Sequence, residues 1–195
     1  MRLDAAELER LRALVPDRAA PVRVAPAAVR KLGPLARVTA LGSARVLRSQ
    51  PANIFRVLGR HPSLFRAWLR YSAKLMPRGT LPRRDAELVI LRVAWRTRAP
   101  YEWNQLVWLG SRAGLSAADV ERAASDDLAG WPPRQRTLVS ATDELLASSR
   151  LTDDTWAAVE RELGTKGAIE LCMLVGQYQG LGTALGGLGV QVEPA

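Results

Sequence analysis

Apolar residues recur along the chain at intervals of three and four, the spacing that places them on one face of an α-helix. The clearest amphipathic segment covers residues 63–76, and the most continuously apolar one covers residues 83–98. Alternation of apolar and polar residues, which would predict strands, is short wherever it occurs. The pattern therefore predicts an all-α protein.

Proline, glycine and capping patterns divide the periodic segments into separate helices. A Ser-x-x-acid pattern such as Ser116 to Asp119 begins a helix, and glycine commonly follows the end of one. Gly164 therefore predicts a break between the last two helices. A proline-containing arm at residues 21–34 has room for a short helical turn. The predicted helices cover residues 5–15, 35–47, 52–60, 63–76, 83–98, 101–113, 116–124, 133–149, 152–163 and 165–185.

The composition is that of a globular protein of about one domain, with 195 residues, 48% hydrophobic and 24% charged. Residues 1–50 are predicted to form a basic N-terminal helix and arm, and residues 51–195 a helical domain. The most apolar stretch, residues 168–190, contains Glu170 and many small residues, which favours a buried helix over a membrane span. No signal-peptide pattern is present, so we expect a cytoplasmic protein without a membrane partner.

Positive charge is concentrated in the first part of the chain. Residues 1–82 hold 16 of the 28 Lys and Arg residues but 4 of the 19 acidic ones. Such an excess fits a surface for nucleic acid, or a solvated basic face whose arginines pair with acidic partners. The arginines are scattered singly among apolar residues, without a nucleic-acid motif, so we favour the second interpretation and expect no nucleic-acid partner.

Cysteine and histidine are nearly absent, with one of each, Cys172 and His61. A Cys/His zinc site needs about four such ligands, and a Ser-His-Asp triad would have to use His61. The position of His61 before Pro62, at a helix break, favours a structural role, although it is the one histidine that a site could use. We expect no metal ion and no cofactor.

A series of short motifs runs in a fixed order through residues 50–193. They are Asn53-Ile-Phe55, His61-Pro-Ser-Leu64, Leu81-Pro-Arg-Arg-Asp-Ala-Glu87-Leu-Val-Ile-Leu-Arg92, Ala99-Pro-Tyr-Glu-Trp103, Ala113-Gly-Leu-Ser116, Thr152-Asp-Asp-Thr-Trp156, Ile169-Glu-Leu, Val175-Gly-Gln-Tyr178 and Leu188-Gly-Val190. Together they resemble the carboxymuconolactone decarboxylase family, which includes the alkyl hydroperoxidase D-like proteins. The resemblance implies a helical bundle that assembles through apolar helices into dimers, trimers or hexamers.

The chain lacks residues that this family uses for chemistry. In the redox branch of the family that this chain resembles, a Glu is followed twelve residues later by a Cys-x-x-Cys motif. A His follows four residues after the second Cys. Counted from Glu87, these positions hold Ala99, Glu102 and Leu106. Peroxide reduction needs a thiolate, so we expect no peroxidase activity. The decarboxylase-like branch commonly carries Tyr-Glu-Trp and then a His; the triplet is present from Tyr101, but Leu106 again replaces the His.

Glu87, Glu102 and Tyr101 are the candidate catalytic residues. A carboxyl group in a helix as apolar as that of Glu87 is either paired with Arg92 or Arg112 or tuned as a general base with a raised pKa. Glu102 takes the place of the family cysteine that faces the pocket, or is a first-turn carboxylate favoured by the helix dipole. Tyr101 can donate to a carbonyl or oxyanion, or pack at a subunit interface.

The candidate substrate-binding residues are Trp95, Trp103, Leu106, Asn104 and His61. Tryptophans at this density build either a core or an interface, or they line a pocket. A pocket of this kind would suit a flat hydrophobic substrate such as an aromatic polyketide.

Two functions remain open. The first is a cofactor-independent decarboxylase, lyase, isomerase or cyclase that transfers protons on a hydrophobic, aromatic or polyketide-like carbonyl compound of a biosynthetic or catabolic pathway. The second is a non-catalytic member of the family that binds a ligand or serves assembly. A cavity that holds both carboxyl groups would favour the first, and a site filled by Leu106 and tryptophans the second. Both functions predict a homo-oligomer.

Overall fold

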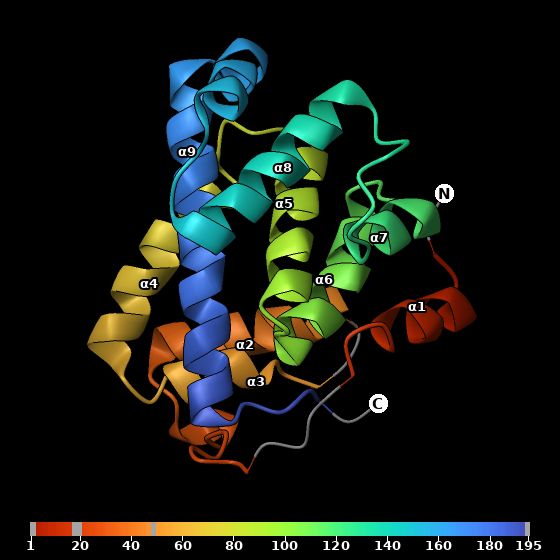
Figure 1. Ribbon diagram of the computed structural model, residues 1–195. Coiled ribbons are helices and arrows are strands. Elements are labelled where there is room, and N and C mark those ends of the chain that lie inside the picture. The colour runs from red at the N-terminus through yellow and green to blue at the C-terminus, as the bar shows by residue number, and fades with distance from the viewer. Residues whose placement is uncertain (1–2, 17–20, 48–49, 194–195) are drawn as a thin grey trace.

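The computed structural model describes residues 3–16, 21–47 and 50–193, and these residues form an all-α fold without strands (Figure 1). The remaining residues of the predicted arm and domain lie outside this range. The helices are α1 (Ala5–Arg12), α2 (Pro34–Leu47), α3 (Asn53–Leu58), α4 (Pro62–Leu75), α5 (Arg83–Arg96), α6 (Pro100–Arg112), α7 (Ala117–Ala123), α8 (Pro133–Ser148) and α9 (Asp153–Leu188), with a 3₁₀ turn at Val29–Lys31. The predicted fold class is confirmed.

Local signals set the helix boundaries as predicted. The Ser116 hydroxyl accepts a hydrogen bond from the Asp119 amide, and the Asp119 carboxylate accepts one from the Ser116 amide, so the capping box of α7 is formed. Gly164 interrupts α9 with φ 65° and ψ 172°, a conformation that glycine adopts at little cost. The predicted break at Gly164 is therefore confirmed: it is a kink where two helical segments join to form α9.

Helix α5 lies at the centre of the bundle and packs against α6, α8 and α9 (Figure 1). Every residue from Asp85 to Trp95 is buried. A helix buried on all sides is apolar around its whole circumference, which explains its run of Leu, Val and Ile. The prediction of a buried central helix in this region is confirmed.

The buried charged residues of α5 are paired. The fully buried Arg92 guanidinium donates to both Asp143 oxygens, at 2.7 and 2.6 Å, and to the carbonyls of Ala123 and Ser125 at 2.8 and 2.6 Å. Burial opposes ionisation of Asp143, but hydrogen bonds from Arg96 and Arg92 hold its pKa below the usual value. This ion pair ties α5 to α8.

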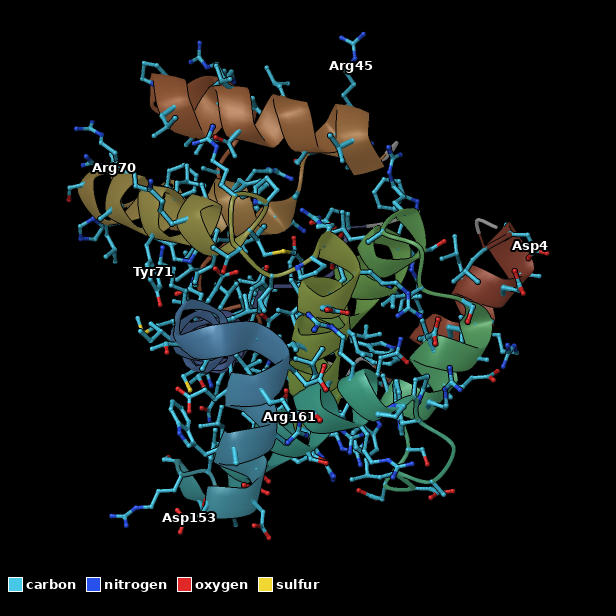
Figure 2. All side chains as sticks on the ribbon, turned by 90° about the horizontal axis from the view of Figure 1, so that it is seen from above. Asp4, Arg45, Arg70, Tyr71, Asp153 and Arg161 are labelled. Carbon is cyan, nitrogen blue, oxygen red and sulfur yellow. The ribbon has the colours of Figure 1, made fainter. Side chains whose placement is uncertain are left out.

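The N-terminal segments pack on the rest of the bundle. Leu11 and Val15 are buried in the main core, and α1 packs against α6 and α7. Residues of α2 form a second small core with Phe65 of α4. Arg45 of α2 and Arg70 of α4 point away from the bundle (Figure 2). In the described part of the chain, no helix has both the length and the apolar character that a membrane crossing requires.

Removal of the Asp143 carboxylate would leave the Arg92 charge buried and unpaired. We expect Asp143→Ala to lower the free energy of unfolding by about 3–5 kcal/mol, measured by urea denaturation. Asp126 also pairs with Arg96, but its side chain is 78% exposed, so Asp126→Ala is the matched control and should cost less than about 1 kcal/mol. Equal losses for the two variants would contradict the structural importance of the buried pair.

Candidate active site

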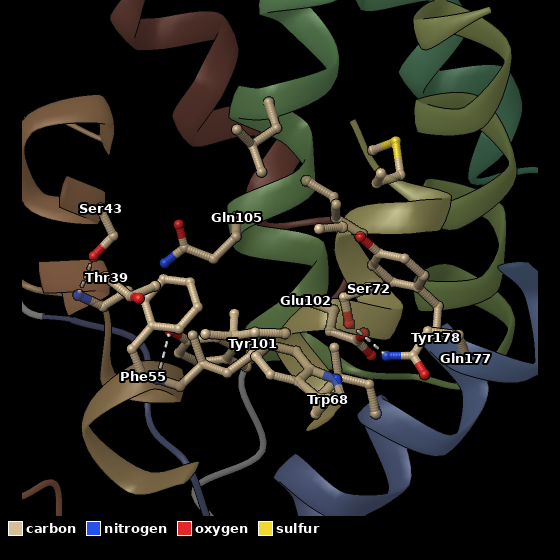
Figure 3. A pocket seen from close by; sticks show the side chains of 18 of the residues that line it. Thr39, Ser43, Phe55, Trp68, Ser72, Tyr101, Glu102, Gln105, Gln177 and Tyr178 are labelled. Carbon is tan, nitrogen blue, oxygen red and sulfur yellow. Dashed lines mark hydrogen bonds between the residues drawn. The ribbon is translucent and has the colours of Figure 1, made fainter. Parts of the chain in front are cut away.

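A cavity of about 430 Å³ lies between α2, α3, α4, α6 and α9 (Figure 3). Its walls are mainly aliphatic and aromatic, and Leu106, Trp68 and Phe55 form part of them. The polar residues that line it are Thr39, Ser43, Ser72, Tyr101, Glu102, Gln105, Gln177 and Tyr178. An apolar cavity with a few polar side chains is typical of a small-molecule site.

Glu102 is the carboxyl group of this cavity. The residue is 4% exposed, and neither carboxyl oxygen has a hydrogen-bond partner among the described residues. Burial disfavours the charged form and raises the pKa of Glu102 to about 8. The side chain is therefore mainly protonated at neutral pH and can donate a proton into the cavity.

The turn between α5 and α6 positions Glu102. The Ala99 amide donates to the Ala94 carbonyl at 2.9 Å, and α6 then begins at Pro100, a residue that suits the first turn of a helix. Gly182 of α9 faces the carboxyl group, since a Cβ atom at this position would lie 2.5 Å from Glu102 Oε2. A glycine at 182 is thus what allows α9 to approach Glu102 so closely.

Glu87 is fully buried behind the cavity and does not line it. Its carboxylate lies 2.5 Å from the guanidinium of Arg83, one turn earlier in α5. Burial raises the pKa of Glu87 to about 7, although Arg83 acts in the opposite direction. The predicted ion pair of Glu87 with Arg92 or Arg112 is wrong. Arg92 pairs with Asp143, and the Arg112 guanidinium stacks on Trp108.

Tyr178 of α9 lies close enough to Glu87 and Glu102 for both carboxyl groups to affect its pKa. It lines the cavity beside Glu102 (Figure 3), and burial together with the charges of Glu87 and Glu102 raises its pKa. Three titratable side chains from α5, α6 and α9 therefore form one cluster. Sequence analysis did not select Tyr178 as a site residue, although it stands in one of the family motifs, among the few polar residues of an apolar helix.

Tyr101 lines the cavity, but its hydroxyl is already hydrogen-bonded. It donates to the Glu193 carboxylate at 2.8 Å and accepts from the Ile54 amide at 3.1 Å. Gln105 also donates to Glu193, at 2.5 Å. The C-terminal segment therefore holds two residues of the cavity wall in place, and the predicted role of Tyr101 as a donor to substrate stays a prediction.

Two further polar groups lie in the cavity wall. The indole N–H of Trp68 is buried and has no hydrogen-bond partner among the described residues. Gln177 donates to the Ser72 hydroxyl at 3.0 Å (Figure 3). The ring of Trp68 packs against Phe55 and Phe65, with centroids 6.4 and 5.9 Å apart. A ligand that accepts hydrogen bonds would find a free donor at Trp68.

The structure places both predicted pocket tryptophans outside the cavity. Trp103 is fully buried, and its indole N–H donates to the Leu11 carbonyl at 2.9 Å. Trp95 is surrounded by the guanidinium groups of Arg92, Arg96 and Arg98, which lie 4.6 to 5.5 Å from its ring centroid. These tryptophans bind α1 and arginine side chains instead of lining the pocket, which corrects the prediction.

Asn104 and His61 also lie outside the cavity, whereas Leu106 lines it. The Asn104 carbonyl accepts from Arg12 at 3.2 Å. His61 caps α4, where its Nδ1 accepts from the Leu64 amide at 3.4 Å, and it lines a separate groove of about 500 Å³. Of the predicted residues, the structure thus brings together Glu102, Tyr101 and Leu106, with Glu87 behind them.

No group of three or more His, Cys, Asp or Glu side chains in the described ranges is arranged to hold a metal ion.

Residues 62–144 match the sequence model of the carboxymuconolactone decarboxylase family. No curated protein matches the chain.

Solved structures share the fold at low sequence identity. An uncharacterised peroxidase-related protein from Ralstonia eutropha, with an alkylhydroperoxidase D core, is 18% identical with a TM-score of 0.74, over 90% of this chain and 94% of that one. A protein of unknown function from Agrobacterium tumefaciens, named for alkylhydroperoxidase D and antioxidant defence, is 14% identical with a TM-score of 0.63, over 71% and 96%.

A third similar structure is a cysteine-to-alanine variant of the debrominase Bmp8 in complex with 2,3,4-tribromopyrrole. It is 16% identical to this chain with a TM-score of 0.73, over 90% of this chain and 94% of that one. Identities this low establish a common fold, and the chemistry has to be argued from the site itself.

Burial of Glu102 makes the stability of the protein depend on pH. Between pH 4.5, the ordinary pKa of Glu, and about pH 8, the folded state keeps a proton that the unfolded state releases, so stability falls as pH rises through this window. We expect Glu102→Gln to reduce this fall by on the order of 1 kcal/mol per pH unit, measured by urea unfolding at pH 5, 6.5 and 8. The exposed Glu9→Gln is the control, and an unchanged slope in Glu102→Gln would exclude the raised pKa.

Proposed function

We propose that this chain, whose residues 62–144 match the sequence model of the carboxymuconolactone decarboxylase family, is a cofactor-independent acid–base enzyme that acts on a hydrophobic carbonyl compound. One observation carries this proposal: Glu102, buried and without a hydrogen-bond partner, lines an apolar cavity. A carboxyl group kept neutral by burial at neutral pH is suited to general acid catalysis.

The proposed chemistry is proton transfer by Glu102. The protonated carboxyl group donates to the carbonyl oxygen, or to a carbanion centre, of the bound substrate. The resulting carboxylate recovers a proton from the carbon next to the carbonyl group or, where CO₂ leaves, from water. This cycle serves an isomerase, a decarboxylase, a lyase or a cyclase. A catalytic pKa of about 8 lies close to neutral pH, where general acid catalysis is most effective.

Tyr178 and Glu87 support Glu102 in this proposal. Tyr178 lies within the field of both carboxyl groups, and Glu87 has a pKa of about 7, so the cluster can hold an exchangeable proton next to the cavity. Glu87 does not line the cavity, and Arg83 stabilises its charged form. We therefore assign Glu87 a positioning role and Glu102 the contact with substrate.

The cavity walls favour an aromatic or polyketide-like carbonyl substrate. Phe55 and Trp68 offer apolar ring surfaces, and the indole N–H of Trp68 is a donor for a carbonyl oxygen. The debrominase of similar fold holds 2,3,4-tribromopyrrole, which supports the capacity of this fold for a small aromatic ring. Partial desolvation in such a cavity strengthens each hydrogen bond to the substrate.

Peroxidase activity does not fit these residues. Ala99 and Glu102 occupy the spacing at which the redox branch of the family has its two cysteines. Cys172 lies on α9, half-buried, and is not among the residues that line the cavity; burial raises the pKa of its thiol. A thiol with a raised pKa is a poor nucleophile at neutral pH.

A ligand-binding or assembly protein is the second candidate. The observations in its favour are Leu106 in the place of the family histidine and the ion pair that holds Glu87 to Arg83. In this alternative the cavity binds the same kind of hydrophobic compound, but no proton is transferred.

A screen of β-keto acids, enolisable ketones and polyphenolic compounds tests the proposal. Because the reaction needs the protonated carboxyl group, we expect kcat/KM to fall as the pH rises through about 8, and Glu102→Gln to lower kcat by about 10²-fold or more. Glu9→Gln is the control and should leave the rate unchanged.

Binding without turnover decides between the two candidates. Ligands that bind in the cavity, quench Trp68 fluorescence and are not converted would favour the second candidate. Full activity in Glu102→Gln would remove Glu102 from the reaction.

A further inference from the structure

A second pocket, of about 270 Å³, shares Tyr101 and Glu102 with the larger cavity. It lies between the α5–α6 turn and the C-terminal part of α9, which meet at the same end of the bundle (Figure 1). Glu102 is therefore a wall residue of two different pockets. The larger one is bounded by apolar side chains, and the smaller one by the start of a helix and by glycines.

The helix that opens into the small pocket has free amide donors. Helix α6 has 13 residues, and its N-cap, Ala99, supplies no side-chain hydrogen bond. The amides of Tyr101 and Glu102 donate to no backbone or side-chain acceptor in the described ranges. Unpaired amides at the positive end of the helix dipole attract anions.

Glu102 is a second and independent indication of a ligand. It is 4% exposed, lines the small pocket and has no hydrogen-bond partner among the described residues. A buried polar group of this kind usually has a partner. At neutral pH it is protonated, since burial raises its pKa to about 8, so it offers a donor and no negative charge to an incoming anion.

Charge and space at the pocket agree with an anion. Among the described residues that line it, Arg98 is the one cation and Glu102 the one carboxyl group. Arg98 is exposed, and its guanidinium also lies 5.5 Å from the ring centroid of Trp95. Its left-handed conformation, with φ 53°, belongs to the C-terminal cap of α5, where the Ala99 amide donates to the Ala94 carbonyl. Gly182 and Gly186 of α9 form part of the wall and add no side chain to it.

We propose that the small pocket binds a carboxylate or similar small monoanion, held by the free amides of Tyr101 and Glu102, by Arg98 and by the proton of Glu102. This site goes beyond the proposed function, because it requires no reaction in the larger cavity. An anion bound in the small pocket favours the protonated form of Glu102. Because Glu102 also lines the larger cavity, the anion affects the protonation state of the carboxyl group there.

The proposal predicts a pH-dependent affinity. Above about pH 8 Glu102 ionises and repels the anion, so affinity falls. The other titratable or charged groups around Glu102 are Tyr178 on α9, Glu87 with Arg83 on α5, and Glu193 against Tyr101. None of these groups gains positive charge as the pH rises, so none compensates for the loss.

Titration of ¹⁵N-labelled protein with sodium acetate, at constant ionic strength set with sodium chloride, tests the site. We expect saturable shifts of the Tyr101 and Glu102 amide signals at pH 6.5, and an affinity about tenfold weaker at pH 9. Glu102→Gln should lose most of this pH dependence; a small part should remain, because burial raises the pKa of Glu87 to about 7 and this group also ionises between the two pH values. Absence of saturable shifts at these amides, or an unchanged pH dependence in Glu102→Gln, would overturn the proposal.

Two glycine variants provide a matched comparison. A Cβ atom at Gly182 would lie 2.5 Å from Glu102 Oε2 and 3.2 Å from the Ala99 Cβ, whereas a Cβ atom at Gly176 meets nothing within 4 Å. We expect Gly182→Ala to weaken acetate binding at least tenfold and Gly176→Ala to leave it unchanged. Equal binding by both variants would place the acetate elsewhere.

Binding of a second compound, phenylacetate, tells whether the carboxylate in the small pocket belongs to a larger substrate or to a free small anion. Phenylacetate that binds more tightly than acetate, and also shifts Tyr178 signals, indicates the acid group of a substrate that reaches both pockets. Equal affinity for the two compounds indicates a free small anion. Because every readout is binding, failure of the anion site is distinguishable from failure of the proposed enzyme activity.

Discussion

The whole structure depends on the burial of α5, which is surrounded by other helices along its length. The charged groups in the buried part of this helix, from Asp85 to Trp95, cannot reach solvent, so each needs a partner. Arg92 pairs with Asp143 of α8, Asp85 with Arg134 at the start of α8, and Glu87 with Arg83. The first two pairs fix the position of α8 on α5, and the short turn after α5 fixes the start of α6. Helix α6 in turn carries the residues Tyr101, Glu102, Gln105 and Leu106 of the cavity wall.

Glu102 is the exception to this rule of pairing. It is as deeply buried as the paired residues, but the described part of the chain gives its oxygens no partner. The lowest-energy response of an unpaired buried carboxyl group is to remain protonated, and this response makes it a proton donor at neutral pH. The same burial thus has opposite consequences in α5 and α6: Arg92 and Asp143 are held charged and serve stability, whereas Glu102 is held neutral and remains free for a ligand.

The fold by itself does not decide this chemistry. Structures with the same arrangement of helices include peroxidase-related proteins and a debrominase, and their low identity to this chain means that side chains at the shared positions have changed. At the spacing where the redox branch of the family would have Cys-x-x-Cys and then His, this chain has Ala99, Glu102 and Leu106. The proposed chemistry therefore rests on a carboxyl group at a position where the redox branch would have a thiol.

The sequence by itself determined the helices, because the forces that form them act over three or four residues: the apolar period, the capping box at Ser116 and the glycine at 164 are all local. It also indicated Glu102, through its spacing from Glu87. Only the tertiary structure decided which side chains share a cavity. Trp103 lies on the same helix as Glu102 but turns toward Leu11, while Tyr178 comes from a distant helix, and Glu193 approaches Tyr101 from the C-terminal segment. Such contacts depend on the packing of segments far apart in the chain, for which the local pattern carries no signal.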